Sequence, residues 1–133
     1  MFRIKYSREV ILKLLYQIDV LELEGTVCET ILEDNLIFFK GLNHDEKEFI
    51  KKIIQKVLSE KKQIDGLIGN HLIGWSLKRL TQIDRNLLRM GIGESYFNNE
   101  KAIIIDDILR IAKKYSGEDS YRIINAILDK VIQ

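Results

Sequence analysis

The stretch YSREVILKLLYQIDVLEL, residues 6–23, carries a repeat that predicts the fold class of this protein. Its apolar residues recur at spacings of three and four, so they fall on one side of an α-helix: Val10, Ile11, Leu14, Leu15, Ile18 and Leu21. Arg3 and Lys5 stand just upstream, and Ser7 is expected to cap the helix. Arg8 and Tyr16 fall off the centre of the apolar stripe. The pattern predicts an amphipathic helix with a basic start.

The same spacing recurs along the rest of the chain, which predicts an all-α fold, a compact bundle of six to seven helices. There is no proline and the glycines are scattered, whereas an all-β chain needs turn residues about every 8–12 positions. Asn43 is expected to cap a helix that continues to about residue 71, with Gly66 weakening it. β-branching at AIIID, residues 102–106, also allows a short strand, but no partner strand is evident.

The stretch GNHLIGWSLKRL, residues 69–80, is the expected interior boundary because it holds two glycines and the lone Trp75. It divides one domain, residues 1–133, into sub-bundles of about 1–72 and 76–133. No signal peptide or run of 18 apolar residues is seen, so we expect a cytoplasmic protein that does not span a membrane. The net charge of +1 means that any nucleic-acid surface must come from local segregation of charge.

Catalytic chemistry is not indicated by the sequence, and we expect neither an enzyme nor a cofactor. His44 and His71 lack the i, i+4 partner of a helical metal site, and a single cysteine excludes an internal disulfide. Asp106 and Asp107 point about 100° apart on a helix, so they do not form a facing carboxylate pair. One of these two carboxylates is expected to bond a neighbouring helix end.

The stretch YSGEDSYRIINAILDK, residues 115–130, allows two interpretations. The simpler one is a helix junction, in which Gly117 takes the left-handed conformation and Asp119 or Ser120 caps the last helix. The other is a surface that grips a phosphate backbone and a stacked base. It draws on the cations and the ring around the junction, namely Lys113, Lys114, Arg122 and Tyr115.

Several stretches resemble the NusB family of transcription antitermination factors. They are SREVILKLLYQID (residues 7–19), IDRNLLRMGIGE (83–94), IIIDDILRIAKKYSGEDS (103–120) and RIINAILDKV (122–131). The resemblance implies an all-helical fold of two three-helix-type halves. It also implies binding of the single-stranded boxA RNA of ribosomal operons together with the small-subunit ribosomal protein NusE, within the RNA polymerase antitermination complex.

The resemblance also assigns residues to these roles. Asp84 matches a position on the face that contacts NusE. The expected RNA-binding residues, with Arg3 and Lys113 added for their charge, are Arg3, Lys5, Arg8, Tyr16, Lys113, Tyr115, Asp119, Ser120, Arg122 and Asn125. The sequence departs from the family at Tyr6, where arginines are usual, and at Ile123, where a phenylalanine is usual.

These assignments require the basic start of the chain and the junction at residues 117–120 to lie side by side on one exposed ridge. Arg3, Lys5 and Arg8 offer about three cationic contacts to single-stranded RNA. The logarithm of the binding constant would then fall with the logarithm of the salt concentration with a slope of about −2, so binding without a partner is expected to be weak. If NusE holds the RNA through a second contact, the RNA then binds this protein almost as an intramolecular step.

Two other functions stay open at this point. One is an RNA-positioning module of the kind fused to RNA cytosine methyltransferases, although no methyltransferase portion follows Gln133 in the sequence. The other is a protein-binding helical adaptor or a homodimer without an RNA role, which the near-zero net charge favours.

Overall fold

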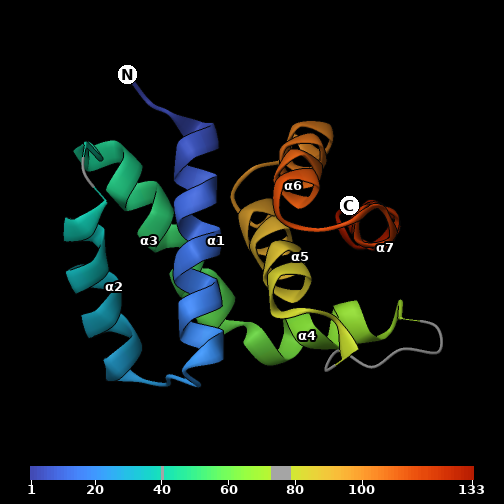
Figure 1. The fold of residues 1–133 in the computed structure, drawn as a ribbon, viewed down its shortest axis with the longest axis horizontal. Coiled ribbons are helices and arrows are strands. Elements are labelled where there is room, and N and C mark those ends of the chain that lie inside the picture. The colour runs from blue at the N-terminus through green and yellow to red at the C-terminus, as the bar shows by residue number, and fades with distance from the viewer. Residues whose placement is uncertain (40, 73–78) are drawn as a thin grey trace.

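A computed structural model describes residues 1–39, 41–72 and 79–133, and it confirms the all-α prediction. Seven α-helices and no strand occur in these ranges (Figure 1). The helices are α1 (Ile4–Val20), α2 (Thr26–Phe38), α3 (His44–Ser59), α4 (Lys61–Gly69), α5 (Gln82–Ser95), α6 (Lys101–Tyr115) and α7 (Glu118–Val131). No helix among the described residues is both long and apolar enough to cross a membrane. The expected boundary at Trp75 lies outside the described residues.

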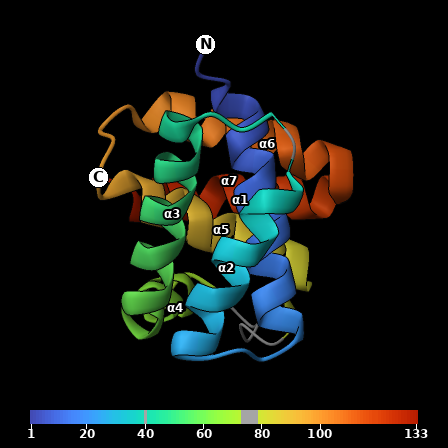
Figure 2. The ribbon, with the colours of Figure 1, turned by 90° about the vertical axis from the view of Figure 1, so that its left-hand side faces the viewer.

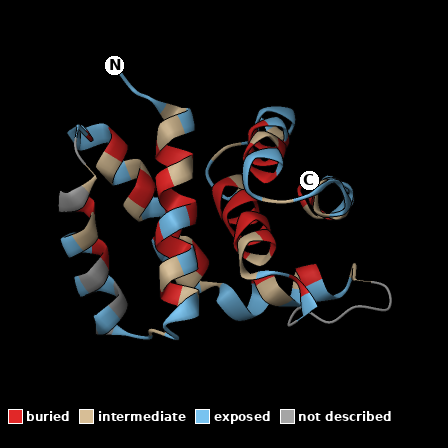
Figure 3. Cartoon of the chain, in the orientation of Figure 1, coloured by how far each residue is buried: buried red, intermediate tan, exposed pale blue. Residues whose placement is uncertain are grey.

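Helix α5 lies at the centre of the molecule and packs against α1, α3, α4, α6 and α7. Figure 3 shows α5 buried along most of its length, and ten of its fourteen residues are buried. α1 lies between α2 on one side and α5 and α6 on the other, whereas α3 packs against both α1 and α5 (Figures 1 and 2). Since α1 and α3 both contact α5, the two expected sub-bundles share one hydrophobic core.

The start of α3 was predicted correctly from Asn43. Its side chain accepts a hydrogen bond from the main-chain amide of Glu46, and the Glu46 carboxylate accepts one from the main-chain amide of Asn43. The two bonds form a capping box. Ser7 does not cap α1, because that helix already begins at Ile4 and the Ser7 hydroxyl donates to the carbonyl of Arg3.

The expected continuous helix to residue 71 is interrupted at Glu60, where α3 ends and α4 begins. At AIIID the chain is helical within α6, so the alternative of a strand is wrong there. Its isoleucines contribute to an amphipathic helix, in which Ile104 and Ile105 are buried and Ile103 is exposed.

A group of charged side chains joins α1, α4 and α5 at one end of the bundle. Asp19 accepts from Arg85 at 2.7 Å, from Asn86 at 2.9 Å and from Arg89 at 3.2 Å. Arg89 also donates to both carboxylate oxygens of Asp65, at 2.8 and 2.9 Å. Burial opposes ionisation of Asp19, but the bonds from Arg85 and Asn86 and the nearby arginine charges lower its pKa. These contacts fix where α1 ends relative to α5.

Candidate RNA interface

Arg8 is buried where α1 meets α5 and α6, with 1% of its surface exposed. Its guanidinium donates to the two carboxylate oxygens of Glu94 at 2.8 and 2.6 Å, and to Asp107 at 3.0 Å. Burial alone would lower the pKa of Arg8, but the bonds and charges of both carboxylates outweigh burial and raise it. Arg8 lies off the centre of the apolar stripe, as expected, but it is buried, so its charge is not available at the surface. While these bonds hold, Arg8 can affect RNA binding only through the position of α1.

Next to Arg8, the surface between α1 and α6 carries a row of charged residues that we name the α1–α6 strip: Lys5, Glu9, Arg110, Lys114 and Tyr115. Lys114 Nζ donates to Glu9 Oε1 at 2.7 Å. Arg110 Nη1 lies 3.5 Å from Glu9 Oε2, and the Tyr115 hydroxyl lies 3.4 Å from Glu9 Oε1. Arg110 also reaches the main-chain carbonyl of Lys5 at 3.5 Å. The first turns of α1 therefore lie directly beside the last turns of α6.

Glu9 is ionised within this strip. Burial favours its neutral form, but the hydrogen bond and charge of Lys114, followed by those of Arg110, lower its pKa below the ordinary value. The pKa of Lys114 is raised in turn, first by its hydrogen bond to Glu9. A single carboxylate thus holds two cations and one phenol at the α1–α6 boundary.

Tyr16 extends the strip along α1. At about 100° per residue, Lys5, Glu9 and Tyr16 fall within about 40° of one another around the helix. The Tyr16 side chain is 40% exposed, so its ring is accessible from the same side as the cations of the strip.

Arg3 turns away from the strip towards α3. Its guanidinium donates to both carboxylate oxygens of Glu46 at 3.0 Å and also to the carbonyl of Gly41. Glu46 is fully buried, and the bonds from Arg3 together with the Asn43 amide lower its pKa to about 2. The basic start of the chain is therefore divided, because Lys5 lies beside α6 while the charge of Arg3 is used to attach the N-terminus to α3.

The junction between α6 and α7, residues 116–120, is fastened to the start of α5. Ser116 and Ser120 donate their hydroxyls to the two carboxylate oxygens of Asp84, at 2.7 and 2.6 Å. Asp84 is 5% exposed, and its amide is capped by the Thr81 hydroxyl at 3.1 Å. The residue assigned by resemblance to a protein contact thus has its carboxylate occupied inside the chain.

The backbone of this junction differs from the predicted one. Gly117 has φ −98° and ψ −177°, which is extended rather than left-handed, and it is itself the capping residue of α7. Neither Asp119 nor Ser120 caps α7, because both lie inside its first turn. The two serines can reach Asp84 because the chain stays extended between the helices.

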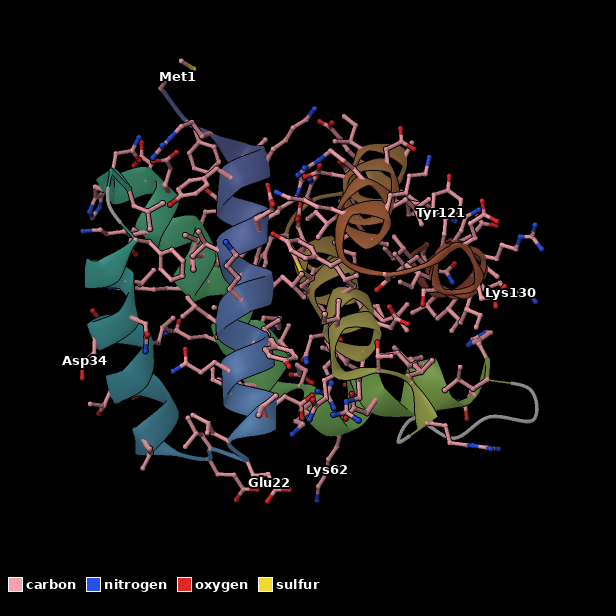
Figure 4. The ribbon with its side chains drawn as sticks, viewed as in Figure 1. Met1, Glu22, Asp34, Lys62, Tyr121 and Lys130 are labelled. Carbon is pink, nitrogen blue, oxygen red and sulfur yellow. The ribbon has the colours of Figure 1, made fainter. Side chains whose placement is uncertain are left out.

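In and around the junction, the side chains of several predicted residues are exposed: Lys113, Asp119, Arg122 and Asn125. Lys113 Nζ lies 4.9 Å from the centre of the Tyr121 ring, and Lys114 Nζ lies 5.4 Å from that of Tyr115 (Figure 4 labels Tyr121). The contacts of Arg110 and Lys114 join α6 to Lys5 and Glu9 of α1, and Lys113 joins α6 to Tyr121 of α7. Arg3 and Arg8 take no part in these contacts, and the placement of Lys5 and the junction side by side on one ridge stays a prediction.

Some residues of this site were missed from the sequence. Asp107 bonds the side chains of Arg8 and Arg110, at 3.0 Å in the first case, and does not bond a helix end. The burial of Asp107 could have been predicted, because it lies at helical spacing from the buried residues of α6, as Arg8 does from those of α1. Glu9 and Arg110 gave no such signal. Among the described residues, no group of three or more His, Cys, Asp or Glu side chains could hold a metal ion.

Comparison with known proteins gives a consistent result. The model of the NusB family matches residues 5–133. The chain is 33% identical to the transcription antitermination protein NusB of Ruminiclostridium cellulolyticum over 128 residues, covering 94% of this chain and 85% of that protein. It is 35% identical to NusB of Fervidobacterium nodosum, covering 93% and 86%.

Solved structures are similar over nearly the whole chain. The structure of T. maritima NusB matches with a TM-score of 0.87 and 32% identity, covering 99% of this chain and 92% of that one. A crystal structure of antitermination factors NusB and NusE in complex with double-stranded RNA matches with a TM-score of 0.79 and 28% identity, covering 96% and 94%.

Proposed function

Since the chain belongs to the NusB family of non-enzymatic transcription antitermination proteins, we propose that it binds the boxA RNA of ribosomal operon leaders together with ribosomal protein NusE. The observation that carries the proposal is the set of contacts that joins Lys5 and Glu9 of α1 to α6, and Lys113 of α6 to Tyr121 of α7. The related NusB that was solved with NusE and RNA supports both partners. The RNA polymerase antitermination complex is the assembly in which we expect the protein to act.

The exposed residues of this surface suit single-stranded RNA. Lys5, Lys113 and Arg122 offer cations to phosphates, and the exposed rings of Tyr16 and Tyr115 can stack on bases. Stacking of one base on an aromatic side chain is worth about 1–3 kcal/mol and tolerates different sequences. We assign Asp119 and Asn125 to base edges, since both can bond donor groups there and both are exposed.

The remaining predicted residues receive an indirect role in this proposal. Arg8 holds α1 against α5 and α6, and Arg3 attaches the N-terminus to α3. Ser120 and Asp84 fix the junction. NusE would then approach the start of α5 near Asp84 and contact neighbouring exposed groups rather than the occupied carboxylate.

The magnitude of the charge favours joint binding. About three phosphate contacts give a single-strand salt slope of about −2, so the protein alone should bind weakly at physiological salt. A tethered second contact through NusE raises the effective concentration of RNA at the surface, which can increase affinity by about a hundredfold or more.

The test is a fluorescence anisotropy titration of labelled boxA RNA, with and without NusE, at two salt concentrations. We expect NusE to tighten binding at least about tenfold. Replacing both Lys5 and Lys113 with Ala should weaken it and flatten the salt slope by about 1.4. Lys62→Ala is the matched control, because Lys62 is exposed at the opposite end of the molecule from Met1 (Figure 4). Equal affinity with and without NusE, or equal loss in the control, would contradict the proposal.

A further inference from the structure

We propose that Glu9 is an internal competitor for RNA phosphates, which keeps the α1–α6 strip from binding RNA without boxA features. This inference rests on the proposed RNA-binding function and adds a residue that sets its specificity. It follows from the position of an ionised carboxylate among the cations that the RNA backbone would use.

The contacts of Glu9 define the competition. Its carboxylate accepts from Lys114 at 2.7 Å, lies 3.5 Å from Arg110 Nη1, and is 3.4 Å from the Tyr115 hydroxyl. Lys5 and Lys13 are one turn away on either side along α1. A phosphate that approaches Lys114 therefore meets a cation that is already paired, and a like charge beside it.

The ion pairs of Glu9 are poorly explained as a contribution to stability. Glu9 is 15% exposed, but its partners Lys114 and Arg110 are 54% and 35% exposed, so water and salt screen these pairs and they contribute little to folding. The attachment of α1 to α5 and α6 is already made by Arg8, whose pairs with Glu94 and Asp107 are 1–5% exposed. The carboxylate of Glu9 thus has its main effect at the surface, on anions that approach α6.

Such a competitor improves discrimination between RNAs. Every RNA must displace Glu9 from Lys114 to use that cation, so an RNA that makes backbone contacts alone binds weakly. A boxA RNA whose base edges are also bonded by Asp119 and Asn125 can bind without the Lys114 cation, whereas an RNA held by backbone contacts alone depends on it. Removing the negative charge should therefore favour unrelated RNA more than boxA RNA.

The experiment compares Glu9→Gln with the wild-type protein, using boxA RNA and an unrelated single-stranded RNA of the same length, with NusE present. Gln keeps the size of the side chain and can still accept a hydrogen bond from Lys114. We expect unrelated RNA to bind about tenfold more tightly, boxA RNA to gain less, and the log–log salt slope to steepen by about 0.7, as for one additional cation.

Glu29→Gln is the matched control. It makes the same change in net charge at an exposed residue of α2, which lies on the other side of α1 from α6 (Figure 1). Affinity for either RNA should stay within about twofold of the wild type, because a charge more than a Debye length away is largely screened. An equal gain in this control would attribute the effect to net charge and overturn the inference.

A second variant makes the result independent of folding effects. In a Lys114→Ala background, Glu9→Gln should gain much less, since the cation that Glu9 withholds is gone. Melting temperatures and far-UV circular dichroism verify that each variant is folded. Unchanged or weaker binding by folded Glu9→Gln, or an equal gain without Lys114, would overturn the role of Glu9. Failure of the wild type to bind any RNA would instead overturn the proposed function.

Discussion

Arg8 shows at the scale of a single residue how a charge can be kept inside a helical bundle. Three hydrogen bonds to Glu94 and Asp107 satisfy most of its donors, and every described buried side-chain nitrogen or oxygen has a partner. The two carboxylates compensate the charge of the guanidinium, and each is itself nearly inaccessible to water. Loss of Arg8 would therefore leave the buried Glu94 without a counter-charge, while Asp107 would keep only its pair with Arg110.

Arg8→Met is expected to lower the free energy of unfolding by about 3–5 kcal/mol, since removing one partner of a buried ion pair leaves the charge of the other uncompensated. The measurement is urea denaturation followed by circular dichroism. Arg122→Ala, at an exposed position, should change stability by less than about 0.5 kcal/mol. An Arg8→Met variant as stable as the wild type would show that the ion pairs contribute nothing net to folding.

Glu46 is expected to make stability depend on pH in the acid range. Its pKa falls from an ordinary 4.5 to about 2 in the folded protein, chiefly through the hydrogen bonds from Arg3 and the Asn43 amide. A lowered folded pKa contributes stability that is complete above pH 4.5 and is lost as the pH falls towards 2. The stability difference between wild type and Glu46→Gln should shrink over this window. A carboxyl titration by NMR with a midpoint near 4.5 would contradict this assignment.

Helices α3 and α5 approach closely at Gly93, which is the clearest constraint at the scale of elements. A Cβ added there would lie 2.6 Å from Val57 Cγ2, inside the contact distance of two carbon atoms. At Gly91, two residues closer to the start of α5, an added Cβ would lie 3.2–3.5 Å from side-chain atoms of Leu128 and Ile108. The two glycines let α5 lie between α3 on one side and α6 and α7 on the other.

Gly93→Ala is expected to destabilise the protein by about 1–3 kcal/mol, because the added methyl group forces α3 and α5 apart. Gly66→Ala is the matched control, because Gly66 is an exposed residue of α4 and its added Cβ would meet nothing within 4 Å. That substitution should stabilise by about 0.5–1 kcal/mol through helix propensity. Thermal unfolding of the two variants shows whether each substitution lowers or raises stability. A stabilising Gly93→Ala would contradict the close approach of α3 and α5.

At the scale of the whole molecule, the two expected halves depend on each other. The apolar sides of α1 and α3 face α5, which also packs against α6 and α7. The charged group around Asp19 and the ion pairs of Arg8 cross the same boundary. Neither half can bury its apolar surface without the other.

We therefore expect a single unfolding transition. Denaturation followed by far-UV circular dichroism and by near-UV signals of the tyrosines should give coincident curves. A fragment of residues 1–72 should have much less helix than the same residues have in the intact chain. Two separated transitions, or a fragment that folds by itself, would show that the sub-bundles are independent domains.

The sequence alone predicted the helices, because the spacing of apolar residues depends on 3.6 residues per turn, a local property of the chain. It also predicted the cap at Asn43, where donor and acceptor are three residues apart. The resemblance carried by residues 7–19 and 83–131 was enough to predict the family.

Tertiary structure decided which charged residues are available at the surface. Arg8 pairs with acids 86 and 99 positions away, and Asp84 accepts from serines 32 and 36 positions away. Local periodicity gives the side of a helix on which such a residue lies, but not the group that faces it. That depends on how the helices pack together, so the burial of Arg8 and the attachment of Arg3 to α3, away from the α1–α6 strip, could be learned only from the folded chain.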